Sequence, residues 1–231
     1  MKNWYSHAEF MDELQKINIL FEDNHLLVVE KPINIPVCED NSGDKDLLNI
    51  LKNYIKVKYK KKGNVYLGLV HRLDRPVGGV MVFAKTSKAA SRLSEQVRNQ
   101  ELEKIYYAVV EGKIKSQDTF VDYLIKDKNL NMSFVTNKNK GKEAKLKYHL
   151  VDLKNNFSLV KIKLYTGRSH QIRVQFSSRG FPLVGDAKYN KNNNKINIAL
   201  FAKSLTFYHP ISKEKMLFEL ELPKRYPFNL F

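Results

Sequence analysis

The sequence predicts a globular protein of the mixed α+β class. Hydrophobic residues make up 43% of its 231 residues, which is enough for a substantial core. Many short apolar segments have the length and composition of β-strands, whereas only a few separate stretches have helical spacing. We see no internal repeat and no clear linker, and a chain of this length allows one large domain or two small ones. These observations favour a mixed α+β domain.

Two strands open the predicted domain, after an N-terminal arm over residues 1–16. They cover residues 17–22 and 26–31, and Asp23 and Asn24 between them are a typical turn-forming pair. The few apolar residues of the arm have helical spacing, so we expect it to be helical or irregular.

Two helices are predicted in the first half of the chain. Residues 44–58 place their apolar side chains on one helical face, and Asp44 or Ser42 is expected to cap this helix. Residues 87–99 form a second amphipathic helix, capped by Thr86 or the serine that follows it.

The remaining strands are short runs rich in β-branched and aromatic residues. They are expected at residues 67–70, 80–84, 104–110, 120–125, 132–136, 159–164, 196–202, 205–208 and 216–222. A third helix is predicted over 169–178 and ends before Gly180.

A polar loop between two apolar strands, HRLDRPVGG, carries the first candidate functional residue. Pro76 fixes its own backbone and keeps Arg75 out of the helical region. One carboxylate, Asp74, lies in this loop among two arginines and a histidine. A carboxylate on a loop held by rigid strands is a common arrangement for a catalytic group. The plain alternative is a tight connection in which Asp74 only pairs with Arg72 or Arg75.

A second informative stretch reads LYTGRSHQIRV. In a helix, His170 and Arg173 are three residues apart and share a face, and Arg168 lies at the helix entrance. The plain alternative is a helix start capped by Thr166 or Ser169, with arginines that are merely solvated.

The charge balance points to a polyanionic partner. The formal net charge is +16 and the pI is about 9.7, which favours nucleic acid, although a solubility surface has the same composition. Lysines recur at 58–62, 138–147 and 188–195, in segments expected to be loops or exposed strand faces.

Several other classes are disfavoured. The single cysteine, Cys38, excludes an internal disulfide, and the N-terminus does not resemble a signal peptide, so a soluble cytoplasmic protein is expected. The six histidines lack metal-ligand spacing, and there is no phosphate-binding glycine loop and no nucleophile elbow. We therefore expect no metal and no cofactor.

Five motifs, in this order and spacing, resemble the RluA family of RNA pseudouridine synthases. They are LLVVEKP at 26–32, HRLD at 71–74, KIYYAVVEG at 104–112, TGRSHQIR at 166–173 and FPLVGDAKY at 181–189. The resemblance implies the catalytic fold of that family over residues 17–231, a mixed, largely antiparallel sheet with flanking helices and an active-site cleft. The arm at 1–16 is too short for the S4 RNA-binding domain that many members carry.

The resemblance also implies a reaction and its residues. The family isomerises specific uridines to pseudouridine in structured ribosomal or transfer RNA, without a cofactor. Asp74 corresponds to the essential aspartate, which attacks C1′ or removes the C2′ proton. Arg173 corresponds to the arginine that pairs with it, Tyr106 to the tyrosine that stacks on uracil, and Arg72 to the side chain that fills the space of the flipped base. Lys31 is expected to shape the site.

The sequence also departs from the family pattern at two places that closely follow these motifs. Arg-Pro-Val-Gly-Gly follows the aspartate where the family has x-x-Thr-Ser-Gly, and Gln175 stands where histidine is common. The alternatives are a non-catalytic RNA-binding protein on the same scaffold and an N-glycosidic hydrolase. RNA is the expected partner of a monomeric protein, with no DNA and no membrane.

Overall fold

The computed structural model describes residues 14–40, 42–192 and 195–231. The chain divides into two compact units, described one at a time below. The first consists of Met1–Leu102 and Thr206–Phe218, and the second of Glu103–Leu205 and Glu219–Phe231.

The predicted arm over 1–16 lies outside the described residues except for its last three. The predicted boundary between this arm and a domain over 17–231 therefore stays a prediction.

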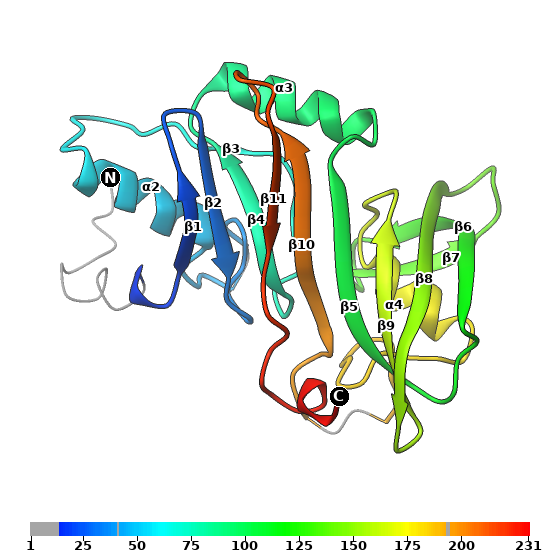
Figure 1. Ribbon diagram of the computed structural model, residues 1–231. Helices are drawn as coiled ribbons and strands as arrows, with labels where there is room; N and C mark the ends of the chain where they lie inside the picture. Colours follow the sequence, from blue (N-terminus) through cyan, green and yellow to red (C-terminus); the bar gives the residue numbers. More distant parts are fainter. Residues whose placement is uncertain (1–13, 41, 193–194) are drawn as a thin grey trace. The chain divides into compact units, whose positions relative to one another are not determined.

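The first unit holds the N-terminal strands, two helices and nearly all of β11 (Figure 1). Its elements are β1 (Asn18–Glu22), β2 (Leu26–Lys31), α2 (Leu47–Lys58), β3 (Gly68–Leu69), β4 (Gly78–Ala84), α3 (Ser87–Arg98) and β11 (Lys215–Glu219). Strand β2 pairs antiparallel with β1 and with β4, and the short β3 pairs antiparallel with β4. Every residue of β4 is buried, as its nearly unbroken apolar sequence predicts.

Both helices of this unit begin at a side-chain N-cap. Helix α2 starts later than predicted, because Asp46, and not Asp44 or Ser42, accepts a hydrogen bond from the backbone N–H of Asn49. Helix α3 starts where predicted, and Thr86 caps it through the backbone N–H of Ala89.

The second unit contains a longer run of antiparallel strands. Its elements are β5 (Glu103–Glu111), β6 (Gln117–Asp127), β7 (Met132–Thr136), β8 (Lys142–Lys154), β9 (Phe157–Leu164), α4 (Gln171–Ser177), the first part of β10 (Leu200–Tyr208) and a C-terminal 3₁₀ turn, η1 (Phe228–Leu230). Successive neighbours in this sheet are β5, β9, β8, β6 and β7.

The longest strand of the unit, β8, is not among the strands predicted from the sequence. Its sequence KEAKLKYHLVDLK is rich in lysine, which indicates a charged segment more strongly than a strand. Ala144, Leu146 and Tyr148 are buried while the residues between them are more exposed, so the period-two alternation is the signal for a strand. The strands predicted at 196–202 and 205–208 form a single strand, β10, which begins only at Leu200.

One face of this sheet carries α4 (Figure 1). Three rings attach the helix to it: the centroid of Phe176 in α4 lies 5.1 Å from that of Phe120 in β6 and 5.4 Å from that of Tyr148 in β8. The two strand rings also contact each other, at 5.2 Å. We call this side of the sheet the α4 face.

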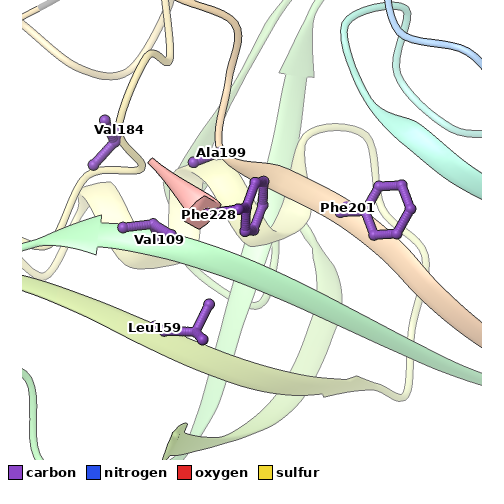
Figure 2. Packing of buried hydrophobic residues seen from close by; sticks show 6 residues of the cluster. All are labelled: Val109, Leu159, Val184, Ala199, Phe201 and Phe228. Carbon is purple, nitrogen blue, oxygen red and sulfur yellow. The ribbon is translucent and has the colours of Figure 1, made fainter. Parts of the chain in front are cut away.

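The opposite face is covered at one end by the C-terminal segment. Figure 2 shows the buried side chains that pack there, from β5, β9, β10, η1 and the loops: Val109, Leu159, Val184, Ala199, Phe201 and Phe228. Leu220, Leu222 and Phe231 of the same C-terminal segment pack against this cluster. The end of the chain is therefore part of the core of the second unit.

Candidate active site

Asp74 lies in the first unit, on the loop between β3 and β4. Its carbonyl accepts a hydrogen bond of 2.9 Å from the backbone N–H of Val77, which closes a tight turn. Leu73, one residue earlier, is buried, and Nε2 of His71 accepts a hydrogen bond of 3.2 Å from the backbone of Val82 in β4. Buried neighbours on both sides thus hold a partly buried carboxylate at the edge of a rigid strand pair.

The ammonium of Lys31 lies directly under this turn. The side chain is 1% exposed, and Nζ donates to the carbonyl oxygens of Pro32 at 2.9 Å, Arg75 at 2.9 Å and Val77 at 2.8 Å. Three carbonyl acceptors match the three N–H groups of a charged lysine. Lys31 therefore ties the end of β2 to the loop of Asp74.

Burial has a strong effect on the pKa of Lys31. It lowers the pKa from 10.5 to about 7, although the nearby charge of Asp74 acts in the opposite direction and raises it. The ammonium and the carboxylate therefore lie close enough to interact through their charges.

The two arginines of the loop have different surroundings. Arg75 turns toward the 40–44 segment, where its guanidinium pairs with Asp44 and donates to Oγ of Ser42 at 3.0 Å. Arg72 is exposed. Arg75 thus binds carboxylates other than Asp74, and the plain alternative, in which Asp74 only pairs with Arg72 or Arg75, stays open.

Tyr106 lies in the second unit, in the middle of β5. It is opposite Ile162 of β9, which is opposite Tyr148 of β8. Directly paired residues of an antiparallel sheet point to the same face. Since Tyr148 packs against Phe176 of α4, Tyr106 also lies on the α4 face, and it is 7% exposed.

Arg173 is buried in α4, and its partners include Asp186 and Tyr189. Its Nε and Nη2 donate to the two carboxylate oxygens of Asp186, at 2.8 and 2.7 Å. Its guanidinium carbon also lies 5.2 Å from the ring centre of Tyr189. The ring of His170 meets the same tyrosine edge-on, with 2.8 Å between Nδ1 and the tyrosine oxygen. His170 lies just before α4 and not within it as predicted, yet both His170 and Arg173 contact Tyr189.

The start of α4 differs from the expected cap. The cap position is His170, in a left-handed conformation with φ 54°, and neither Thr166 nor Ser169 fills that position. Instead, the side-chain carbonyl of Gln171 reaches back and accepts hydrogen bonds from Oγ1 of Thr166 at 2.7 Å and from the backbone of Arg168 at 3.0 Å.

Gln175 anchors the next turn of the helix to the sheet. Its amide nitrogen donates to a carboxylate oxygen of Asp122 at 2.7 Å and to the carbonyl of Ala144 at 3.2 Å. Arg179 donates to the same carboxylate at 2.8 Å. Gln175, which departs from the family pattern, therefore links α4 to strands β6 and β8. The same helix carries Arg173.

The four sequence-predicted site residues fall into two groups. Asp74 and Arg72 belong to the first unit, and Tyr106 and Arg173 belong to the α4 face of the second. The pairing of Asp74 with Arg173 stays a prediction. Sequence reasoning missed Asp186 as a partner of Arg173, although the motif FPLVGDAKY contains it.

Within the described part of the chain, no group of three or more histidine, cysteine or acidic side chains could hold a metal ion. No helix in the same residues is long and apolar enough to cross a membrane.

Comparison with known proteins identifies the family. A family model described as RNA pseudouridylate synthase matches residues 25–178. The chain belongs to this family of RNA pseudouridine synthases. The synthase is 35% identical to an uncharacterized RNA pseudouridine synthase of Aquifex aeolicus, over 91% of this chain and 71% of that protein. It is 34% identical to the ribosomal large subunit pseudouridine synthase D of Zymomonas mobilis, over 90% of this chain and 70% of that protein.

Solved structures confirm the predicted fold of the synthase. Human RNA pseudouridylate synthase domain containing 4 matches with a TM-score of 0.77 and 22% identity, over 94% of this chain and 92% of that one. The related human domain containing 1 matches with a TM-score of 0.72 and 19% identity, over 92% and 85% of the two chains. The predicted enzyme class, an isomerase acting on RNA, is likewise confirmed by the family.

Proposed function

We propose that the synthase converts one or more uridines of large-subunit ribosomal RNA to pseudouridine. We choose this RNA because proteins similar to this chain are named as large-subunit synthases. These include the large-subunit synthase D of Zymomonas mobilis and the large-subunit synthase C of Buchnera aphidicola, which is 35% identical over 91% of this chain. The net charge of +16 fits a polyanionic substrate of this kind. Such a substrate also agrees with the predicted cytoplasmic location.

Asp74 is proposed as the essential carboxylate. Attack on C1′ and removal of the C2′ proton both require the ionised form. The loop that carries Asp74 is tied down by the buried side chain of Lys31, which donates to the carbonyl groups of Arg75 and Val77. A rigid loop also reduces the loss of entropy when the carboxylate meets the sugar.

The other three site residues are proposed to hold the target nucleotide. A uridine in folded RNA must leave its stack before an enzyme can reach its sugar carbon. Arg72 is exposed and is proposed to fill the vacated space. The ring of Tyr106 is proposed to stack on the extruded uracil. Arg173 is proposed to pair with Asp74, with Asp186 and Tyr189 fixing its orientation.

Mapping pseudouridines in RNA from cells with and without this gene tests the proposal. We expect at least one site to be lost from large-subunit ribosomal RNA and to return when the gene is restored. A gene encoding the Asp74→Asn variant should not restore it. Loss of a site from transfer RNA alone, with ribosomal RNA unchanged, would overturn the proposed substrate.

A further inference from the structure

Lys104 is a buried cation next to the proposed uracil site. It lies in β5, two residues before Tyr106, and is 9% exposed. Across the sheet, Lys104 pairs with Leu164 of β9, and Leu164 pairs with Leu146 of β8. Leu146 pairs in turn with Phe120 of β6. Since Phe120 packs against α4, Lys104 lies on the α4 face, as Tyr106 does.

The ammonium of Lys104 reaches the loop that leads into α4. A Cβ atom built on Gly167 would lie 3.3 Å from Nζ, which is closer than a normal contact. Glycine at this position therefore lets the ammonium approach the loop backbone closely. Lys104 and Tyr106 are about 7 Å apart along one strand face.

No protein group in the described chain compensates this charge. Lys104 has no hydrogen bond and no ion pair among the described residues, and burial lowers its pKa. A buried cation without a partner costs stability, and such groups are usually paired or bind a ligand. Lys31, by comparison, is also buried but has three carbonyl acceptors. The difference indicates that the partner of Lys104 is not part of the protein.

We propose that Lys104 binds a backbone phosphate next to the uridine that stacks on Tyr106. This inference rests on the proposed function, because it needs an RNA nucleotide at Tyr106. The phosphates on either side of an extruded nucleotide are the charged groups nearest to its base. An unpaired ammonium beside the stacking ring is placed to bind one of them, and a charge-assisted hydrogen bond of this kind is stronger than one to a neutral uracil oxygen. Lys104 would then hold the extruded nucleotide in place from its backbone side.

The test compares Lys104→Met with Lys161→Met, using a ribosomal RNA hairpin that the wild-type enzyme modifies. Lys161 is exposed and lies opposite Tyr107, so it occupies the other face of the same sheet and matches the charge change. We expect Lys104→Met to weaken RNA binding about tenfold to a hundredfold, as for loss of a hydrogen bond to a charged group. The slope of log affinity against log salt should fall by roughly 0.7 to 0.9, the value for one phosphate. Lys161→Met should change both quantities much less.

Two further measurements separate a phosphate contact from a structural role. A hairpin with a neutral methylphosphonate at the 5′ or the 3′ side of the target uridine should weaken binding of the wild type at one of the two positions. The same hairpin should have no further effect on Lys104→Met. This variant should be at least as stable as the wild type, because it removes an uncompensated buried charge.

The inference would be overturned by unchanged affinity and salt slope in Lys104→Met, or by a lower melting temperature with equal losses on all hairpins. Neither result would affect the proposed function, which fails only if the wild type modifies no large-subunit ribosomal RNA.

Discussion

Arg173 and Asp186 form a two-pronged ion pair in the interior of the second unit, with side chains that are 5% and 0% exposed. The same carboxylate also accepts hydrogen bonds from the backbone N–H groups of Lys188 and Tyr189, at 2.9 and 3.2 Å. The pair therefore links α4 to the FPLVGDAKY motif. It also fixes the plane of a guanidinium that is proposed to act on Asp74.

Arg173→Met should reduce both stability and activity. It leaves Asp186 as a buried carboxylate without its cation, and breaking such a pair from one side costs about 3 kcal/mol or more. Urea unfolding and single-turnover pseudouridine formation measure the two effects. Arg168→Met is the matched control, because Arg168 is an exposed arginine in the loop that leads into the same helix. If Arg173→Met unfolded at the wild-type urea concentration, the pair would not be the buried contact described above.

Asp74→Asn should abolish pseudouridine formation while the protein stays folded and binds RNA. The amide has nearly the same shape as the carboxylate, but it can act neither as a nucleophile nor as a base. Product can be measured in purified variant protein with excess enzyme over RNA, and the melting temperature controls for folding. A rate near that of the wild type would remove Asp74 from the proposed mechanism.

The sequence predicts more of the fold than of the contacts that support the site. Strands with a clear alternation or an apolar run are predicted within a few residues of their observed ends. The predicted bounds of β2 and β7 equal the observed ones. The lysine-rich β8 is missed because its charge conceals its periodicity. The start of α2 is also placed too early, since several acidic and hydroxyl side chains near it could act as caps.

Local sequence can indicate Asp74 and Arg173 but cannot give their supporting contacts. Lys31 is 44 residues from Arg75 in the sequence, and Asp186 is 13 residues from Arg173. Such pairs depend on how strands and helices pack, which no local pattern encodes. The same holds for Lys104, which looks like any strand lysine until the register places it on the α4 face.

Lys31→Met should loosen the loop of Asp74. It removes three hydrogen bonds; the carbonyl group of Val77 loses this donor, whereas that of Arg75 keeps the backbone N–H of Asn34. Each buried polar group left unsatisfied costs about 1 to 3 kcal/mol. We expect lower stability and a slower chemical step at saturating RNA. Single-turnover assays and urea unfolding measure both, with Lys88→Met as an exposed control in the same unit. Equal rates for the two variants would show that Lys31 does not position the loop.

A second cluster in the first unit predicts how stability depends on pH. The carboxylate of Glu22 accepts hydrogen bonds from four side chains: Tyr54, Lys58, Tyr59 and Lys85. Burial acts to raise the pKa of Glu22, but these hydrogen bonds outweigh it and lower the pKa from 4.5 to about 2. The folded protein therefore binds fewer protons than the unfolded chain between these two values. The stabilisation is complete above pH 4.5 and is lost as the pH falls to 2.

Glu22→Gln should remove this acid-sensitive part of the stability. Lys58 is nearly half exposed, so water screens part of the interaction, and we expect a contribution on the order of 1 to 2 kcal/mol. Urea unfolding of wild type and variant at pH 7, 4.5, 3 and 2 gives the difference directly, and it should shrink toward zero below pH 4.5. Glu95→Gln, an exposed carboxylate on α3, should show no such trend. A difference that stays constant with pH would contradict the lowered pKa of Glu22.

The lysines around the β7–β8 turn are expected to bind RNA away from the site of chemistry. Lys138, Lys140 and Lys142 are all exposed, in agreement with the loop or exposed strand face predicted there. Each phosphate that a lysine binds releases condensed counterions. Replacing the three lysines with serine should therefore weaken binding and flatten its salt dependence, by up to about 0.7 to 0.9 for each phosphate that is no longer bound. The rate at saturating RNA should barely change, because the chemical step depends on Asp74.

RNA affinities at several salt concentrations, together with single-turnover rates, measure both effects. Identical salt slopes for variant and wild type would mean that this turn is a solvated surface and that other cations of the protein hold the RNA.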